Sequence, residues 1–281
     1  MLKRILLAIQ FHTIIPVRVN GDVSAEDMTG SIPFFPLAGA VQGLVLAASA
    51  LASAHFFDRY IAAALALAVY MIFSGGFDLD GLADTADALA VKSSGAPEAD
   101  RLKRLKIMKD SHVGAMGVMA LVISILLKFV LISGLIRQPA SGTVFPHFFA
   151  PLLMMPVFSK WVTIPVMLHG KPARKDGLGR LFIGNTGIKE IIFASFVVSC
   201  LYFAAFHSHI GAAPFVSEVL LLLFSLGFLY IAGRAVAGFL SGRFGGLTGD
   251  HLGAITEVAE IAFLIIFLLW ARFFWGVGTH I

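Results

Sequence analysis

The chain has 281 residues, of which 58% are hydrophobic and only 14% are Asp, Glu, Lys or Arg. Soluble domains carry about 25% charged residues, so this composition excludes an ordinary soluble domain and indicates a membrane protein with several spans. The single cysteine, Cys200, excludes an intrachain disulfide and a cysteine-based metal site. The formal net charge of +4 becomes informative only through its distribution along the chain.

The hydrophobic pattern predicts an all-α fold, a polytopic membrane helical bundle in one domain over residues 1–281. The segment from Met1 to Val17 has a basic start, and no small-residue cleavage site follows it. Residues 5–17 are therefore expected to form an interfacial helix, with a re-entrant or membrane-buried placement as the alternative. About seven later runs approach the length of a span, about 20 apolar residues. They cover residues 33–56, 60–77, 113–136, 143–159 (extending toward 168), 191–209, 216–233 and 253–271. Three prolines, Pro151, Pro156 and Pro165, predict that the fourth span is kinked or broken.

The positive charges are distributed unevenly between the two sides of these spans. The N-terminus and the loops at 78–112, 160–190 and 234–252 together hold 17 of the 21 Lys and Arg residues. Because cytoplasmic loops carry an excess of Lys and Arg, the N-terminus and these three loops are expected in the cytoplasm. The acidic and glycine-rich motifs lie in the same loops, which predicts an active site at the cytoplasmic face.

Four carboxylates lie within ten residues, at Asp78, Asp80, Asp84 and Asp87. On a helix, Asp80, Asp84 and Asp87 would lie within about 60° of one another. Like charges on one helix face repel, and a hard divalent cation such as Mg²⁺ or Mn²⁺ would relieve this repulsion. The competing interpretation is a solvated helix start, where Asp is favoured.

Polar residues also gather immediately before the third span. Four of them are placed to reach a ligand at the membrane interface. They are Lys109, Asp110, Ser111 and His112. The basic residues just upstream fit equally well an ordinary juxtamembrane charge that meets anionic lipid. This upstream set is Arg101, Lys103, Arg104 and Lys106.

The next two loops combine glycine with cations and an acid. Residues 171–187 alternate glycines with Lys and Arg, a pattern that suits phosphate, and Arg174 is the cation expected to bind it. A turn of small residues then precedes Asp250. The turn residues expected at a substrate are Gly245, Gly246, Thr248 and Gly249.

The predicted last span contains two acids, Glu257 and Glu260, and the third span contains one cation, Lys128. Asp250 lies just before the last span, and on one helix Asp250, Glu257 and Glu260 would lie within about 80°. Acids inside a span are costly and usually functional, so all three are candidate metal ligands. The alternative is that they cap a helix that enters the bilayer only after Glu260. Lys128 is a candidate substrate ligand, and pairing with one of these acids would relieve both charges.

Two acidic clusters with Arg and Lys from neighbouring loops indicate metal-dependent phosphoryl or phosphodiester transfer on a membrane-associated substrate. The histidines lack paired ligand spacing, which argues against zinc. Neither a Walker-type loop nor an inverted repeat is evident, and nothing indicates a nucleic-acid partner. The oligomeric state stays open, and a homo-oligomer is compatible with the sequence.

Six motifs carry a family resemblance. They lie in residues 10–17, 35–39, 75–87, 108–114, 177–179 and 245–254. The most specific parts are Asp80-Gly81-Leu82-Ala83-Asp84, Lys109-Asp110-Ser111 and Gly245-Gly246-x-Thr248-Gly249-Asp250, in this order. With these motifs the chain resembles the cobalamin synthase family, adenosylcobinamide-GDP ribazoletransferase, over nearly its whole length.

The resemblance implies an enzyme of the bacterial or archaeal cytoplasmic membrane. In this family α-ribazole, or its 5′-phosphate, attacks the cobinamide-linked phosphate of adenosylcobinamide-GDP and expels GMP, with Mg²⁺ required. Carried onto this sequence, Asp80, Asp84 and Asp87 become metal ligands and Asp78 an accessory ligand. Asp87 or Asp110 would then act as general base, next to Lys109.

Two alternatives remain. A CDP-alcohol phosphotransferase also uses an Asp-rich helix and Mg²⁺, but that family expects Ala-Arg where this chain has Ala83-Asp84. A transporter would use acids as coupling sites at mid-bilayer, whereas the acidic stretch here lies near a predicted cytoplasmic end.

Overall fold

The computed structural model describes residues 1–17, 19, 21–136, 148–177, 179–207 and 215–274. This part of the chain is helical, and its only β feature is an isolated bridge between Pro172 and Leu247. The predicted all-α class is therefore confirmed. Positions 143–147 and 208–209 of the predicted spans, and Leu178 in the fifth motif, lie outside the described residues.

Within the described residues, six helices are long and apolar enough to cross a membrane. They are α3 (Phe35–Phe56), α7 (Ala115–Leu135), α8 (Phe149–His169), α10 (Ile188–His207), α11 (Phe215–Phe244) and α12 (Gly249–Phe274). The bent pair of α4 (Arg59–Phe73) and α5 (Phe77–Leu89) makes up to seven when it is counted as one span. Six to seven candidate spans agree with the predicted number of about seven and make the chain an integral membrane protein.

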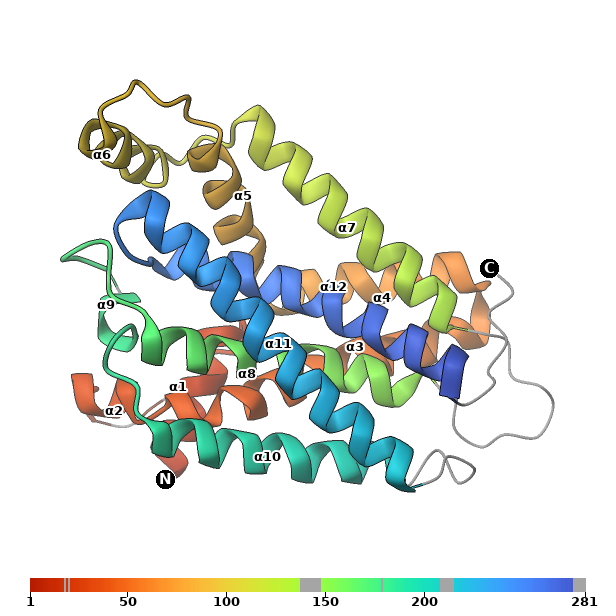
Figure 1. The fold of residues 1–281 in the computed structure, drawn as a ribbon. Helices are drawn as coiled ribbons and strands as arrows, with labels where there is room; N and C mark the ends of the chain where they lie inside the picture. The colour runs from red at the N-terminus through yellow and green to blue at the C-terminus, as the bar shows by residue number, and fades with distance from the viewer. Residues whose placement is uncertain (18, 20, 137–147, 178, 208–214, 275–281) are drawn as a thin grey trace.

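Short helices surround one end of the bundle. They are α1 (Leu2–His12), α2 (Ala25–Thr29), η1 (Ile32–Phe34), α6 (Pro97–Ile107) and α9 (Gly179–Phe182). Figure 1 shows α2, α5, α6 and α9 at the same end. The predicted helix at 5–17 is α1, and it ends earlier than expected because Thr13 adopts an extended backbone.

The bend between α4 and α5 turns the acidic stretch out of line with the second span. The two helices meet at 88°. Gly75 and Gly76 both have left-handed backbones, with φ of 71° and 68°, and glycine is the residue that adopts this conformation without steric cost. The bend therefore depends on this glycine pair, and it sends α5 across the end of the bundle.

Two expectations about helix bounds differ from the structure. The fourth span, predicted to be kinked or broken, is one helix, α8, with Pro156 and Pro165 inside it, so the broken alternative was wrong. The sixth span continues past residue 233 as α11 up to Phe244, so part of the predicted third loop is helical. A reason for the longer helix is that α6 supplies hydrogen-bond donors to its last carbonyls: Arg101 Nε donates to the carbonyl oxygen of Phe244 at 2.9 Å.

The helix α8 forms the centre of the bundle, with nearly all of its residues buried. It packs closely against α3 at Gly39 and Gly43, which are one helical turn apart. A methyl group at Gly43 would collide with the backbone of Leu153, and one at Gly39 with the backbone of Pro156. Small residues at this spacing allow helix backbones to approach in membranes.

We expect Gly43→Ala to destabilise the protein by about 1–3 kcal/mol, because α3 and α8 have to separate to accommodate the methyl group. Gly238→Ala in α11 is the matched control, since a methyl group there meets nothing within 4 Å. Thermal unfolding of both variants in detergent measures the difference. Equal melting temperatures for the two variants would show that the close contact contributes no stability.

Candidate functional site

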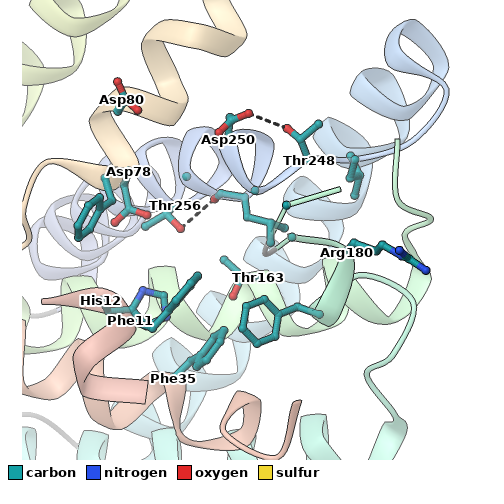
Figure 2. Close-up of a pocket in the computed structure, with 18 of the residues that line it drawn as sticks. Phe11, His12, Phe35, Asp78, Asp80, Thr163, Arg180, Thr248, Asp250 and Thr256 are labelled. Carbon is teal, nitrogen blue, oxygen red and sulfur yellow. Dashed lines mark hydrogen bonds between the residues drawn. The ribbon is translucent and has the colours of Figure 1, made fainter. Parts of the chain in front are cut away.

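A cavity of about 500 Å³ opens among α1, α5, α8, α9 and α12. Figure 2 shows Asp78, Asp80 and Asp250 on one side of it, with Phe11, His12 and Phe35 opposite. The cavity wall also includes Arg174 and Arg180. Acidic, cationic and aromatic side chains therefore share one space.

The acidic side is built by a close crossing of α5 and α12. A methyl group at Gly81 of α5 would lie 2.6 Å from the carbonyl oxygen of Asp250, and one at Gly253 of α12 would lie 3.0 Å from Cα of Asp78. Each helix thus places a glycine against the other helix backbone. This crossing brings the Asp-rich stretch and Asp250 together, as the sequence predicted for a shared site.

Electrostatic interactions connect the acids at this crossing. Asp84 interacts with Asp80, Asp87 and Asp250, and with the cation of Arg174. Arg174 Nη1 lies 3.8 Å from Asp250 Oδ2, and its Nη2 donates to the carbonyl oxygen of Leu105 at 3.2 Å. Asp80 and Asp84 accept no hydrogen bond and form no ion pair within the described ranges. Their repulsion is therefore offset only in part.

The glycine turn before α12 places Arg174. Ala173 N donates to the Leu247 carbonyl oxygen and Leu247 N to the Lys171 carbonyl oxygen, both at 2.8 Å, which fixes the loop against the turn. Gly246, at φ 154°, leaves no room for a side chain, because a methyl group there would lie 2.6 Å from the Lys171 oxygen. Gly245 and Gly246 shape the backbone, while Gly249 lines the cavity.

Thr248 caps the start of α12 and also lines the cavity. Its Oγ1 accepts from the N–H of His251 at 3.3 Å and donates to Asp250 Oδ2 at 3.2 Å. The N–H of Thr248 donates to His251 Nδ1 at 3.0 Å. These bonds satisfy donors at the helix start and hold the Asp250 carboxylate at the cavity.

Two of the predicted metal ligands on α5 already have fixed partners. Asp78 forms an ion pair with Lys160, a fully buried residue of α8. Asp87 accepts hydrogen bonds from the N–H groups of Gly114 and Gly117, at 2.6 and 2.8 Å. A carboxylate at a helix N-terminus is favourable, so Asp87 anchors the start of α7.

The residues before the third span lie near the cavity but not in its wall. Lys109 forms an ion pair of 2.7 Å with Asp176, which does line the cavity. His112 Nδ1 lies 2.6 Å from Asp110 Oδ1, and this hydrogen bond lowers the pKa of Asp110. Ser111 is exposed. A carboxylate with a lowered pKa is a weaker base, which matters for the role predicted for Asp110.

Lys128, Glu257 and Glu260 form a buried cluster away from the cavity wall. Lys128 Nζ lies 2.8 Å from Glu257 Oε2 and forms a second ion pair with Glu260. The pairing of Lys128 with an acid that the sequence suggested is present. Three hydroxyl groups complete the cluster by donating to the two carboxylates. They belong to Tyr70, Ser124 and Ser159. The cluster therefore joins α4, α7, α8 and α12.

Two basic residues of α6, which were compatible with ordinary juxtamembrane charge, have specific partners. Arg101 donates to the carbonyl oxygen of Phe244, and Arg104 Nη1 donates to that of Arg243 at 3.3 Å. Cations and donors at a helix C-terminus are favourable. Arg101 and Arg104 therefore stabilise the end of α11 and the position of the glycine turn that follows it.

The aromatic side of the cavity was not predicted from the sequence. Phe11 and His12 come from the end of α1, Phe35 from the start of α3 and Phe182 from α9. Thr163 and Thr256 also line the cavity, and Arg180 lies at its side (Figure 2). The available signal was the motif at 10–17, which an interfacial helix alone does not explain.

The carboxylates fit a divalent cation only together with a ligand. Within the described residues, no group of three or more His, Cys, Asp or Glu side chains could hold a metal ion by itself. Mg²⁺ typically binds one or two carboxylates and completes its shell with water and substrate phosphates. Asp80 and Asp250, with Asp84 beside them, supply hard oxygen donors that lack a full set of protein partners, so this chemistry fits.

Together these features define an α-helical membrane protein with a site suited to phosphate. A family model described as cobalamin-5-phosphate synthase matches residues 4–268, and the chain belongs to that family. Relatives named adenosylcobinamide-GDP ribazoletransferase include one from Thermodesulfovibrio yellowstonii, 35% identical over 96% of this chain and 97% of its own length. Others come from Thermoanaerobacter sp., 34% identical (95% and 97%), and Geotalea daltonii, 32% identical (94% and 96%). No solved structure matches.

Replacing Lys128 with methionine is expected to cost about 3–5 kcal/mol of stability, because two carboxylates stay buried without their cation. Thermal unfolding in detergent measures the effect. Lys92→Met, at an exposed position, is the control and should melt like the wild type.

Removing the charges of the two acids as well should recover most of this loss. The triple variant Lys128→Met/Glu257→Gln/Glu260→Gln therefore distinguishes an unpaired charge from a packing defect. If the single variant Lys128→Met is as stable as the wild type, the interpretation that Lys128 stabilises two buried carboxylates is contradicted.

Proposed function

We propose that this protein joins α-ribazole, or its 5′-phosphate, to adenosylcobinamide-GDP with release of GMP, using Mg²⁺. The observation that carries the proposal is the cavity in which Asp80 and Asp250 meet Arg174, in a chain of this family. The relatives' printed name, adenosylcobinamide-GDP ribazoletransferase, supports the same reaction.

In this proposal Asp80, Asp84 and Asp250 hold the ion. When bound, Mg²⁺ would neutralise charge on the phosphate oxygens of the diphosphate. Arg174 is placed to bind a phosphate oxygen, because the 3.8 Å contact between its Nη1 and Asp250 is long and leaves the Nη1 donors available. The second cation in the wall, Arg180, faces the same space.

The reaction forms a bond between a free ribose hydroxyl oxygen of ribazole and the phosphorus attached to cobinamide, since the 5′ oxygen of the alternative substrate already carries a phosphate. The bond from that phosphorus to the bridging oxygen of the diphosphate breaks, and GMP leaves with this oxygen. The hydroxyl proton has to be accepted by a base. The roles predicted for Asp87, Asp110 and Lys109 in this step stay predictions, since none of the three lines the cavity wall.

We also propose that the cavity faces the cytoplasm of a bacterial or archaeal cell. The basic segment of α6 and the loop around Arg174 lie at the cavity end of the bundle (Figure 1). Lys and Arg near the ends of spans favour the cytoplasmic side. Both GMP release and access for water-soluble ribazole suit this orientation.

We expect Asp84→Asn to lower GMP release by at least about 10²-fold, a loss typical of removing one charged group from a phosphoryl-transfer site. The assay mixes the purified protein in liposomes with adenosylcobinamide-GDP and α-ribazole. Asp22→Asn is the control, because Asp22 is exposed and far from α5 in sequence. Full activity of Asp84→Asn would contradict the role of this carboxylate.

The same assay distinguishes the alternatives. A CDP-alcohol phosphotransferase would release CMP from a CDP-alcohol and no GMP from adenosylcobinamide-GDP. A transporter would move a solute across the liposome membrane and release neither nucleotide. Either result with well-folded wild-type protein would overturn the proposed reaction.

Removing divalent cations with EDTA is expected to abolish GMP release, because the phosphate charge would face Asp80 and Asp250 without compensation. Adding excess Mg²⁺ should restore the rate, and Mn²⁺ should substitute for it. Undiminished turnover in metal-free buffer would rule out the proposed ion.

A further inference from the structure

Four rings at one end of the cavity form a continuous surface, which we name the aromatic wall: Phe11, His12, Phe35 and Phe182. Phe11 and Phe35 are stacked, with centroids 6.0 Å apart and an angle of 13°. Phe182 packs edge-on against both, at 5.2 and 5.7 Å. His12 contacts Phe35 edge-on at 4.5 Å.

The backbone holds the wall in place before any ligand binds. Gln42 Nε2 donates to the carbonyl oxygen of His12 at 2.5 Å, which ties the end of α1 to α3. Ile14 N donates to the carbonyl oxygen of Phe73 at 3.0 Å, which ties the following residues to the end of α4. The preorganised rings therefore lose little freedom when a flat group stacks on them.

His12 belongs to the wall as a neutral ring. Burial and the nearby charge of Lys160 hold the pKa of His12 well below its ordinary value. Its Nε2 atom is shielded from water and has no hydrogen-bond partner among the described residues. Phe35 and Phe182 are almost fully buried and support the wall from behind. Phe11 and His12 are only partly buried, so they are the rings that a ligand can contact.

The volume of the cavity limits the size of the ligand group that it can bind. A volume of about 500 Å³ accommodates a nucleoside-sized group, whereas a corrin macrocycle with its side chains is larger. Two such groups take part in the proposed reaction, the guanosine of the GDP and the ribazole. Both carry a flat base, so the polarity of the wall has to distinguish them.

Guanine carries several donors and acceptors on its edge, and each needs a partner when buried. The benzimidazole of α-ribazole is nearly apolar and needs stacking more than hydrogen bonds. We propose that the aromatic wall binds the base of ribazole, which directs a free ribose hydroxyl toward the acidic side of the cavity. This inference rests on the proposed function.

Binding without turnover tests the inference separately from the reaction. Isothermal titration in detergent compares α-ribazole and GMP as ligands of the wild type and of Phe11→Ala, with guanosine as a third ligand of the wild type. Because Phe11 is only partly buried, its loss should not prevent folding. We expect the Kd of α-ribazole to rise about tenfold or more, as for loss of a stacking ring, and that of GMP to change less than twofold.

Two further variants serve as controls. Phe11→Trp keeps a stacking surface and should bind α-ribazole nearly as well as the wild type. Phe56→Ala removes an exposed ring at the other end of α3 and should change neither Kd. In turnover, Phe11→Ala should raise the KM for α-ribazole and leave that for adenosylcobinamide-GDP unchanged.

Three outcomes would overturn the inference: weaker GMP binding with unchanged α-ribazole binding in Phe11→Ala, unchanged binding of both, or wild-type protein that binds α-ribazole no tighter than guanosine. The last comparison needs no variant, so it decides even if Phe11→Ala does not fold. Loss of α-ribazole binding in Phe11→Ala with no GMP release by the wild type would instead support the wall and reject the proposed reaction.

Discussion

The close crossing of α5 and α12 is the constraint on which the site depends. Gly81 and Gly253 let each helix backbone rest on the other, and any larger side chain at either position would separate them. Only at this distance do Asp80 and Asp250, far apart in the sequence, line the same cavity. The crossing also concentrates negative charge, so other interactions have to hold the two helices together.

Those interactions divide the predicted acidic ligands into two groups. Four carboxylates have fixed partners inside the protein: Asp78 with Lys160, Asp87 with the start of α7, and Glu257 and Glu260 with Lys128. Asp80 and Asp84 have none among the described interactions, and Asp250 has only Thr248 and a distant Arg174. The first group anchors α4, α5, α7, α8 and α12 around the crossing. In the second group Asp80 and Asp250 line the cavity, and Asp84 interacts with both, which is why the proposed metal site contains these three.

Much of the architecture could be predicted from local sequence properties. Hydrophobic length identified the spans, and helical spacing placed Asp80 and Asp84 on one face. The 88° bend was not predicted, because it needs Gly75 and Gly76 to adopt left-handed backbones together. The length of α11 was also missed, since the residues that stabilise its end come from α6.

The partners of the acids could be predicted only where the chemistry left little choice. A buried lysine beside two buried glutamates has to pair with them, and the sequence suggested this for Lys128. Asp87 is different, because backbone N–H groups carry no signal in the sequence that would mark them as its partners. The aromatic wall was missed for a related reason: four rings from three separate helices meet only after the bundle has packed.

The position of the cavity in the bundle indicates where the parts of a substrate would lie. Thr163 lies six residues before the end of α8, which corresponds to about 9 Å of helix, so the cavity extends into the bundle from the end that carries the charged loops. The rings and the acids line opposite sides of this space (Figure 2). A substrate with a flat base and a phosphate would therefore place its base against the rings and keep its reacting oxygen near the acids. The larger corrinoid would then stay outside the cavity, with only its diphosphate reaching the crossing of α5 and α12.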